Sequence, residues 1–469
     1  MYLKAIGRTF CGLPPDGSEF AVTMGTSNMK PSESNAGVSR RRFLAAAGAA
    51  VALPAFVPGR VLGLGGQASP SKRINIGVVG CGGQGNGNTD GFLRNTDCRV
   101  VAACDVDATH LANMLQKVNG QYNSKDCRGY RDFRELMARK DIDAVMLAVP
   151  DHWHALIAVE AAKEKKDIYG EKPLARTIVE QQAIVRAVKK NRCIWQTGSW
   201  QRSGANFHKA AEIVRNGLIG KITRVEVGLP SGPKNPKEQR KVDSTPPPAE
   251  LDYDLWIGPS TMIPYVGSRI HNNWRWNYNT GGGQLLDWIG HHCDIAHWGM
   301  DCDNSGPLEV SGEGEFPPAD YNWNVCTRYR IEAKYPNAIT MTLAGGHHDI
   351  RAGTKWIGTD GWVWVDRGGF ESSNPDWRDF KDLPEEMRKV KLYRSRDHIR
   401  NFLDCIKSRQ PTITPAETAH HSSIPGHLGL IAMVTGRTLR WDAEKEVILD
   451  DAAASQMLGR PYRGPWKLG

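Results

Sequence analysis

A carboxylate and a histidine are spaced for proton transfer in the second half of the chain. The segment 287–298 reads DWIGHHCDIAHW and follows three consecutive glycines that end at Gly283. If it is helical, Asp287, His291 and Asp294 lie at i, i+4 and i+7 and project from one face. A carboxylate one turn before a histidine can fix the tautomer of the ring and make it a better base. The spacing favours a proton-transfer site, with a structural histidine and a metal site as the alternatives.

A glycine motif near the start of the globular region could bind a pyrophosphate. The apolar run 74–79 leads directly into GCGGQG, which matches Gly-x-Gly-x-x-Gly at Gly80, Gly82 and Gly85. These glycines permit a tight turn, close approach of the backbone to a pyrophosphate, and packing of a helix on the strand. A second apolar run ends at Asp105, 20 residues past Gly85, which is the spacing of an acid that binds the adenosine ribose. Because a carboxylate there repels a 2'-phosphate, NAD is favoured over NADP. The alternative to a dinucleotide-binding site is a glycine-rich turn with a capping Asp.

Strands and helices alternate after this motif, which indicates a parallel sheet with ligand at the carboxyl ends of its strands. Two polar segments, 150–154 (PDHWH) and 171–173 (EKP), lie at such strand ends. We expect helices at 108–118, 132–138 and 154–163, and strands at 100–104, 144–149 and 167–169.

The pattern changes after residue 197. A helix is expected at 207–216, followed by strands with two-residue periodicity at 222–227, 327–333 and 338–343. The segment 228–248 is rich in Pro and Lys and is interpreted as an exposed lid or oligomer arm. The predicted fold is α/β: a doubly wound parallel Rossmann sheet over 69–197, then an α+β domain over 198–469 with a large, open, mostly antiparallel sheet.

The first 68 residues resemble a twin-arginine signal. Ser39-Arg40-Arg41-Arg42-Phe43-Leu44 opens an uncharged, Ala-rich run that ends at Val57 and is too short to span a membrane. A resemblance to twin-arginine substrates implies a protein exported already folded, so a periplasmic or other exported location and a tightly held cofactor are expected. The ten cysteines form no Cys-x-x-Cys pair and are interpreted as buried free thiols.

Composition excludes several classes of protein. Hydrophobic residues make up 40% and charged residues 24%, and no apolar run reaches the roughly 18 residues of a membrane span. Of the net charge of +9, the first 68 residues carry +4, and the remaining +5 is spread over about 400 residues without a basic stripe interleaved with aromatic residues. No nucleic-acid partner is therefore expected. Membrane insertion after export is not expected either.

An ordered set of motifs from residue 72 onward resembles the glucose-fructose oxidoreductase / inositol dehydrogenase / rhizopine catabolism (Gfo/Idh/MocA) family. The set comprises the glycine loop 80–85, the turn 150–154, Glu171-Lys172-Pro173, the segment 281–294, the turn 358–362 and the segment 401–406. The resemblance implies a Rossmann domain followed by an open sheet domain, with the active site in the cleft between them. Oligomers are usual in that family, so a homodimer or homotetramer is expected.

The resemblance also implies the roles of individual residues. Lys172 is expected beside the nicotinamide and the reacting hydroxyl, with His291 as general acid/base and Asp287 as its partner. His292 is the alternative proton-transfer residue, and five tryptophans near the motifs could stack on sugar faces: Trp153, Trp200, Trp274, Trp276 and Trp288. The expected cofactor-binding residues are Gly80, Gly82, Gly83, Gln84, Gly85, Asp105, Pro150, His154, Glu171 and Lys172. The expected substrate-binding residues are Lys172, Trp274, Asp287, His291 and His292, and no metal is expected.

Three functions are compatible with these residues. The first is an exported oxidoreductase that transfers hydride between a sugar or polyol hydroxyl carbon and bound NAD(P). The second is an NAD-dependent glycosidase or lyase that oxidises the sugar ring only transiently, without net redox change. The third is a cofactor-loaded sugar-binding protein without catalytic activity.

Overall fold

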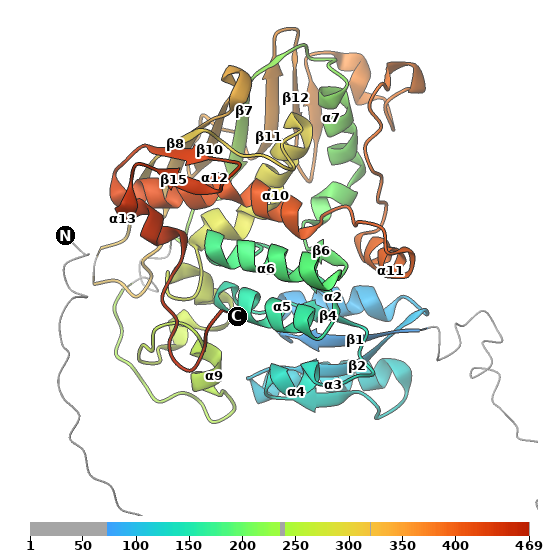
Figure 1. The fold of residues 1–469 in the computed structure, drawn as a ribbon, viewed down its shortest axis with the longest axis vertical. Helices are drawn as coiled ribbons and strands as arrows, with labels where there is room; N and C mark the ends of the chain where they lie inside the picture. The colour runs from blue at the N-terminus through green and yellow to red at the C-terminus, as the bar shows by residue number, and fades with distance from the viewer. Residues whose placement is uncertain (1–72, 235–239, 319, 469) are drawn as a thin grey trace, which may run out of the picture. The chain divides into compact units, whose positions relative to one another are not determined.

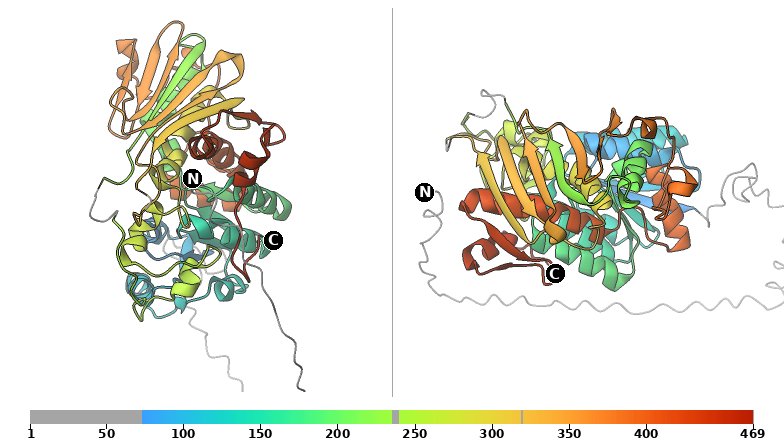
Figure 2. Two further views of the ribbon diagram at one scale, coloured as in Figure 1. Left: turned by 90° about the vertical axis from the view of Figure 1, so that its left-hand side faces the viewer. Right: turned by 90° about the horizontal axis from the view of Figure 1, so that it is seen from above.

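The computed structural model describes residues 73–234, 240–318 and 320–468 (Figure 1, Figure 2). The predicted twin-arginine segment, 1–68, lies outside these residues, as do residues 69–72 of the predicted Rossmann domain. Among the described residues, no helix is both long and apolar enough to cross a membrane.

The first half of the described chain forms a six-stranded parallel sheet in the order β3-β2-β1-β4-β5-β6. This is the doubly wound Rossmann order, and the predicted fold class is confirmed. The order reverses between β1 and β4, where such sheets bind ligands at the carboxyl ends of the strands. The strands are β1 (Ile74–Val79), β2 (Cys98–Cys104), β3 (Arg128–Tyr130), β4 (Ala144–Leu147), β5 (Asp167–Gly170) and β6 (Trp195–Thr197).

Helices cover both faces of this sheet, because successive strand residues point to opposite sides. In β4, Val145 and Leu147 pack with α4, α5 and α6, whereas Ala144 and Met146 pack with α2, α3 and α11. Helix α11 belongs to the second half of the chain and returns to this sheet (Figure 1). The helices are α2 (Gly83–Leu93), α3 (Ala108–Tyr122), α4 (Phe133–Met137), α5 (Asp151–Lys163), α6 (Ile178–Asn191) and α11 (His398–Ser408).

The second half forms a nine-stranded sheet in the order β13-β12-β11-β7-β10-β9-β8-β14-β15. All of its pairings are antiparallel except that of β7 with β10, which is parallel, so the sheet is mixed. Its strands are β7 (Ile222–Leu229), β8 (Glu309–Glu315), β9 (Arg328–Lys334), β10 (Thr340–Gly345), β11 (Gly353–Gly358), β12 (Trp362–Val365), β13 (Phe370–Ser372), β14 (Leu439–Asp442) and β15 (Val447–Leu449).

One face of the second sheet packs on helices and the other carries polar side chains. In β9, Tyr329, Ile331 and Ala333 are buried against the helices, while the residues between them are charged and more exposed. Three helices supply most of the helical side of this core: α7 (Ala205–Arg215), α10 (Gly283–Met300) and α12 (Ala416–Thr435). Two short helices, α9 (Tyr253–Ile257) and α13 (Ala452–Ser455), complete the described set.

The expected element boundaries differ from the structure at two informative places. Helix α5 begins at Asp151 rather than at residue 154, because Pro150 occupies the N-cap and its fixed φ suits a helix start. Strand β10 begins at Thr340 rather than at 338, because Asn337 and Ala338 adopt left-handed φ values of 62° and 60° in the preceding turn. Residues 240–247 of the expected lid are exposed, and 235–239 lie outside the described residues.

The nine described cysteines are free, and eight of them are buried. This confirms, for the described part of the chain, the expected buried thiols. Burial raises the pKa of several of these thiols, for example that of Cys98 to about 12.

Candidate active site

A cleft of about 410 Å³ lies at the carboxyl ends of the first sheet's strands and is lined by residues of both halves of the chain. It brings together most of the residues that the sequence assigns to cofactor and substrate. From the predicted set, the cleft is lined by Gly80, Gly82, Gly83, Gln84, Asp105, Pro150, Glu171, Lys172, Trp274 and Asp287. Gly85, His154, His291 and His292 are not among its lining residues.

The glycine loop has the backbone geometry that a bound pyrophosphate needs. Gly80 has a φ of 91°, and a Cβ on Gly85 would lie 1.9 Å from the Gly80 carbonyl oxygen, so neither position tolerates a side chain. A Cβ on Gly82, by contrast, would meet nothing within 4 Å, which leaves open space in front of the loop. No side chain caps the N-terminus of α2 at Gly82, so its first N–H groups remain available to an anion. The loop fits a dinucleotide.

Asp105 directly follows β2 and is held against this loop. Its Oδ2 accepts a hydrogen bond from the Cys81 backbone N–H at 2.7 Å, and its Oδ1 accepts one from the Asp107 N–H at 2.9 Å. Burial raises the pKa of Asp105, although the two backbone donors act in the opposite direction. The carboxylate is therefore fixed at the edge of the cleft where an adenosine ribose would lie.

A segment from the second half of the chain, residues 249–276, forms the outer wall of the cleft beside Asp105; we call it the strap. Its backbone is hydrogen-bonded to the start of α3, from Ala108 N to Glu250 O at 2.9 Å and from Asp252 N to Val106 O at 3.0 Å. An apolar cluster of the strap packs against Val106 and comprises Leu251, Trp256, Ile257 and Ile270. The strap is thereby anchored to the Rossmann domain.

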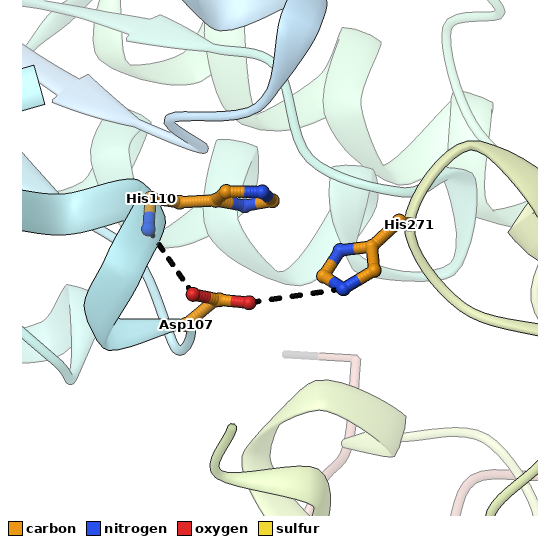
Figure 3. A group of neighbouring side chains, drawn as sticks. All are labelled: Asp107, His110 and His271. Carbon is orange, nitrogen blue, oxygen red and sulfur yellow. Dashed lines mark hydrogen bonds and ion pairs between the residues drawn. The ribbon is translucent and has the colours of Figure 1, made fainter. Parts of the chain in front are cut away.

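Figure 3 shows where the far end of the strap meets α3. The Asp107 carboxylate caps the helix by accepting from the backbone N–H groups of Thr109 and His110, and its other oxygen lies 3.8 Å from Nε2 of His271. The rings of His110 and His271 meet edge to face with centroids 5.0 Å apart. The donor atoms of these three residues lie within 4.8 Å of one another and could hold a metal ion. A second such group, which the sequence also did not predict, comprises His420, His421 and Glu446.

The opposite end of the cleft contains an ion pair between the two halves of the chain. Nζ of Lys172 donates to the backbone oxygen of Asp287 at 2.8 Å and to its carboxylate Oδ1 at 3.0 Å. Nε of Arg275 donates to the same Oδ1 at 2.9 Å. Burial opposes ionisation of Asp287, but Lys172 and Arg275 outweigh it and hold the pKa of this carboxyl below its ordinary value.

Helix α10 can approach Lys172 because Gly290 has no side chain. A Cβ on Gly290 would lie 2.8 Å from Cβ of Lys172, and Oγ of Ser199 donates to the Gly290 carbonyl at 2.7 Å. Gly283, with a φ of 70°, begins the helix. The expected helix is confirmed: α10 begins at Gly283 and carries Asp287, His291 and Asp294 at the expected spacing.

His291 is 4% exposed, and its Nδ1 has no hydrogen-bond partner in the described part of the chain. Burial lowers the pKa of His291 well below its ordinary value, and the positive charges of Lys172 and Arg367 lower it further. The carboxylate of Asp287 is bonded to Lys172 and Arg275 rather than to this ring. Asp287 therefore positions the lysine in this structure, and the expected contact that would orient the histidine is not formed.

The neighbouring positions are engaged in structural contacts. His292 is buried, with its Nδ1 3.3 Å from the Gln201 amide nitrogen, and burial lowers its pKa to about 3. Both ring nitrogens of His154 lie 2.8 Å from backbone carbonyls, those of Pro173 and Val149, so this side chain links the two strand-end turns. Asp294 forms a buried ion pair with Arg202 at 2.7 Å.

The sequence reasoning missed three site residues. Arg275 binds Asp287, and Arg367 lies beside His291; neither carries a local motif. Asp151 is 1% exposed, lines the cleft, and has an Oδ1 without a hydrogen-bond partner in the described residues. Burial raises the pKa of Asp151 to about 7, and the nearby charge of Asp287 adds to this effect. Its place directly after Pro150, four residues past the end of β4, was the available signal.

Two family profiles together match most of the chain. The one described as "Oxidoreductase family, NAD-binding Rossmann fold" matches residues 74–199, and the one described as "Oxidoreductase family, C-terminal alpha/beta domain" matches residues 203–468. The chain belongs to the Gfo/Idh/MocA oxidoreductase family. This confirms the resemblance carried by the glycine loop, the Glu-Lys-Pro segment and the motif on α10.

Individual relatives are more distant. A myo-inositol 2-dehydrogenase of Thermotoga maritima is 29% identical over 202 residues, which cover 41% of this chain and 54% of that protein. A "Glycosyl hydrolase family 109 protein 2" of Shewanella sp. (strain ANA-3) is 29% identical over 33% of this chain and 34% of its own length. The chain thus matches about half or less of these curated relatives. The crystal structure of an aldose-aldose oxidoreductase from Caulobacter crescentus shares the fold, with a TM-score of 0.57, 17% identity, and coverage of 78% of this chain and 99% of its own.

Proposed function

We propose that this protein is a nicotinamide-dependent dehydrogenase that oxidises a hydroxyl group of a sugar or polyol, with NAD preferred over NADP. The observation that carries the proposal is the Lys172–Asp287 pair, which lies in the same cleft as the glycine loop and one helical turn from His291. A cationic donor and a neutral base beside a dinucleotide site are the groups that oxidation of a carbinol requires.

Separate residues of the cleft bind the cofactor and stabilise the reacting oxygen. A nicotinamide, when bound, supplies hydride transfer at its C4 carbon. The N-terminus of α2 and the glycine loop would hold the pyrophosphate, and Asp105 the ribose. Lys172 donates a hydrogen bond to the reacting hydroxyl oxygen and stabilises its developing negative charge. Asp287 and Arg275 keep the lysine in place.

His291 accepts the hydroxyl proton as the C–H bond breaks and the carbonyl forms. Because burial and the nearby cations lower its pKa, the ring is neutral at physiological pH and has a free nitrogen to accept a proton. A nicotinamide held in this cleft would take up the hydrogen of the C–H bond with its electron pair, so the substrate would be oxidised by two electrons while His291 holds the proton.

Tight retention of the cofactor, export by the twin-arginine route and assembly into a homodimer or homotetramer are parts of the same proposal. The strap supports retention, because it covers the adenosine end of the cleft and is anchored by backbone hydrogen bonds. The arginine-rich segment at residues 39–44 supports export. The second sheet, whose polar face is free of the helices of its core, offers a surface for self-association.

The test uses the purified mature protein, without added nucleotide, as a panel of sugars and polyols is introduced. A stoichiometric rise in near-ultraviolet absorbance is expected, because bound NAD accepts hydride. His291→Gln should abolish most of this signal while retaining the bound nucleotide, since the ring moves a proton and touches no part of the pyrophosphate site. Loss of nucleotide and signal together would show that His291 is structural.

A second candidate is redox-neutral cleavage of a glycoside, favoured by the relative named glycosyl hydrolase family 109 protein. In that reaction, oxidation of a ring carbon acidifies the adjacent C–H, elimination follows, and the carbon is reduced again. Release of free sugar from an unactivated glycoside at constant total reduced nucleotide would favour it over the dehydrogenase. Sugar binding with neither signal would leave only a non-catalytic sugar-binding protein.

A further inference from the structure

Three side chains from separate elements form a group beside His291. Trp200 lies in a short 3-10 turn (Trp200–Ser203), Trp288 lies on α10, and Arg367 lies in the turn after β12. The ring centroids of Trp200 and Trp288 are 6.5 Å and 5.3 Å from that of His291. The guanidinium carbon of Arg367 lies 4.7 Å from the Trp200 ring centroid and 4.5 Å from that of Trp288.

Arg367 lacks the acidic partner that comparable arginines have. Within the described residues, four other arginines stack on a tryptophan, and each of them pairs with a carboxylate: Arg134, Arg202, Arg275 and Arg351. For Arg367 no carboxylate oxygen of the described chain lies within 4.0 Å, and its Nε donates to the neutral Oε1 of Gln201 at 3.1 Å. Its two terminal nitrogens are thus left for another acceptor.

The surroundings of Arg367 are open to solvent. Arg367 is exposed and Trp200 is 42% exposed, whereas His291 beside them is buried. A planar guanidinium binds a carboxylate through two parallel N–H···O bonds, and stacking on the indoles holds the plane of this fork. The exposed indole offers a flat apolar surface to sugar C–H groups.

We propose that Trp200 and Arg367 form a subsite for an acidic sugar, in which the carboxylate of a uronic acid pairs with the Arg367 guanidinium while the sugar ring packs on Trp200. This rests on the proposed function, because it places the reacting hydroxyl between His291 and Lys172. A guanidinium can bind either a carboxylate or a phosphate through two hydrogen bonds. A carboxylate is favoured because Arg367 is the one cation of the turn 366–369 (DRGG), and a single guanidinium balances the single charge of a carboxylate.

The electrostatics of the site agree with an anionic substrate. Burial is the largest cause of the lowered pKa of His291, and the charges of Lys172, Arg367 and His292 lower it further. A base that is surrounded by cations accepts a proton poorly. A carboxylate bound to Arg367 offsets one of these cations at the moment when His291 takes the hydroxyl proton.

The experiment compares D-glucuronate and D-galacturonate with their neutral counterparts, D-glucose and D-galactose, on the NAD-loaded full chain. We expect the uronates to reduce the bound cofactor with the higher kcat/KM. Arg367→Gln should lower the ratio of kcat/KM for glucuronate over glucose by roughly tenfold to a hundredfold, since a charge-assisted hydrogen bond is lost. Arg367→Lys, which keeps the charge without the planar fork, should recover only part of that ratio.

A second measurement does not depend on turnover. Binding of glucuronate should change the tryptophan fluorescence of the wild-type protein, and Arg367→Gln should weaken this binding by a similar factor. Arg351→Gln is the matched control, because Arg351 also stacks on a tryptophan but is paired with Glu371 away from His291. It should leave both the ratio and the binding unchanged.

The outcomes separate this inference from the proposed function. Reduction of cofactor by neutral sugars with no preference for uronates, or equal losses for both in Arg367→Gln, would overturn the acidic-sugar subsite and leave the dehydrogenase intact. A preference for glucose 6-phosphate over glucuronate would overturn the carboxylate assignment. Binding of glucuronate that depends on Arg367 but reduces no cofactor would support the subsite and refute the proposed function.

Discussion

The two ends of the cleft are built in different ways. The adenosine end is made of backbone: Gly80, Gly82 and Gly85 provide turns and open space, and Asp105 is held by two backbone N–H groups within one strand-turn-helix-strand unit. The reacting end is made of side chains, in which Lys172 of one half meets Asp287 and Arg275 of the other. A backbone site depends on local conformation, whereas a side-chain ion network depends on how two domains pack.

The largest effect is expected from a substitution that alters the reacting end alone. Lys172→Met should lower turnover by roughly a hundredfold to ten-thousandfold, because the hydroxyl oxygen loses its charged donor. The nucleotide should stay bound, since the glycine loop and Asp105 are unaltered. Single-turnover stopped-flow kinetics measure the rate of cofactor reduction, and the nucleotide content of the purified variant measures cofactor retention. If nucleotide content fell as far as turnover, the two ends would not be separable.

Gly85→Ala should break the adenosine end. The added Cβ would lie 1.9 Å from the Gly80 carbonyl oxygen, and because this neighbour is backbone, the strand and helix must move apart. We expect a loss of about 3 kcal/mol or more in the free energy of unfolding, together with loss of bound nucleotide. Gly87→Ala, on the same helix but with nothing within 4 Å, is the control and should stabilise by about 0.5–1 kcal/mol. Similar urea midpoints for the two variants would contradict the close-packing argument.

Asp151 lines the same cleft and is acted on by the charges of the reacting end, so it sharpens the comparison through pH. Burial raises its pKa to about 7, so the folded protein keeps a proton that the unfolded chain releases near the ordinary aspartate pKa of 3.8. The stability contributed by this proton is present below the unfolded pKa and is lost as pH rises through about 7. Asp151→Asn cannot ionise, so its advantage in unfolding free energy over the wild type should grow from close to zero near pH 4 to roughly 4 kcal/mol near pH 8.

Urea unfolding of the nucleotide-free protein at both pH values measures this difference. Asp320→Asn, at an exposed carboxylate, is the matched control and should show no such trend. A constant difference between Asp151→Asn and the wild type across the pH range would mean that Asp151 is ionised in the folded protein throughout.

The same contrast explains what the sequence could predict. The glycine loop, the spacing to Asp105 and the alternation of strands and helices are local, so motif and periodicity were sufficient for the Rossmann fold. The helical face with Asp287 and His291 was also predictable from its i, i+4 spacing. The cationic partners of Asp287 were not predictable. Lys172 is separated from it by 115 residues and meets it only through packing of the two halves. Arg275 is separated from it by 12 residues and meets it only because the strap folds back against α10.

Arg367 and Asp151 escaped the sequence reasoning for a related reason. Arg367 lies in an ordinary turn, and its significance comes from two tryptophans and a histidine that other elements bring to it. Asp151 was part of a motif, but its raised pKa depends on burial in the folded chain and on the charge of Asp287, which lies 136 residues away on α10. A residue whose chemistry depends on neighbours that are distant in the sequence can be recognised only in the folded structure.

The smallest expected effect concerns the strap. His271 lies 3.8 Å from Asp107 and is half-exposed, so its contact with the Rossmann domain resembles a surface ion pair of at most about 1 kcal/mol. His271→Ala should therefore speed dissociation of reduced nucleotide by no more than roughly fivefold. The rate is measured from the fluorescence of the reduced nucleotide while excess NAD displaces it. The control is His348→Ala, at an exposed position elsewhere, which should not change the rate. Because the backbone hydrogen bonds of Ala108 and Asp252 remain in this variant, a much larger acceleration would mean that one side-chain contact, rather than the backbone anchoring, keeps the strap closed. The adenosine end would then depend on side chains as the reacting end does.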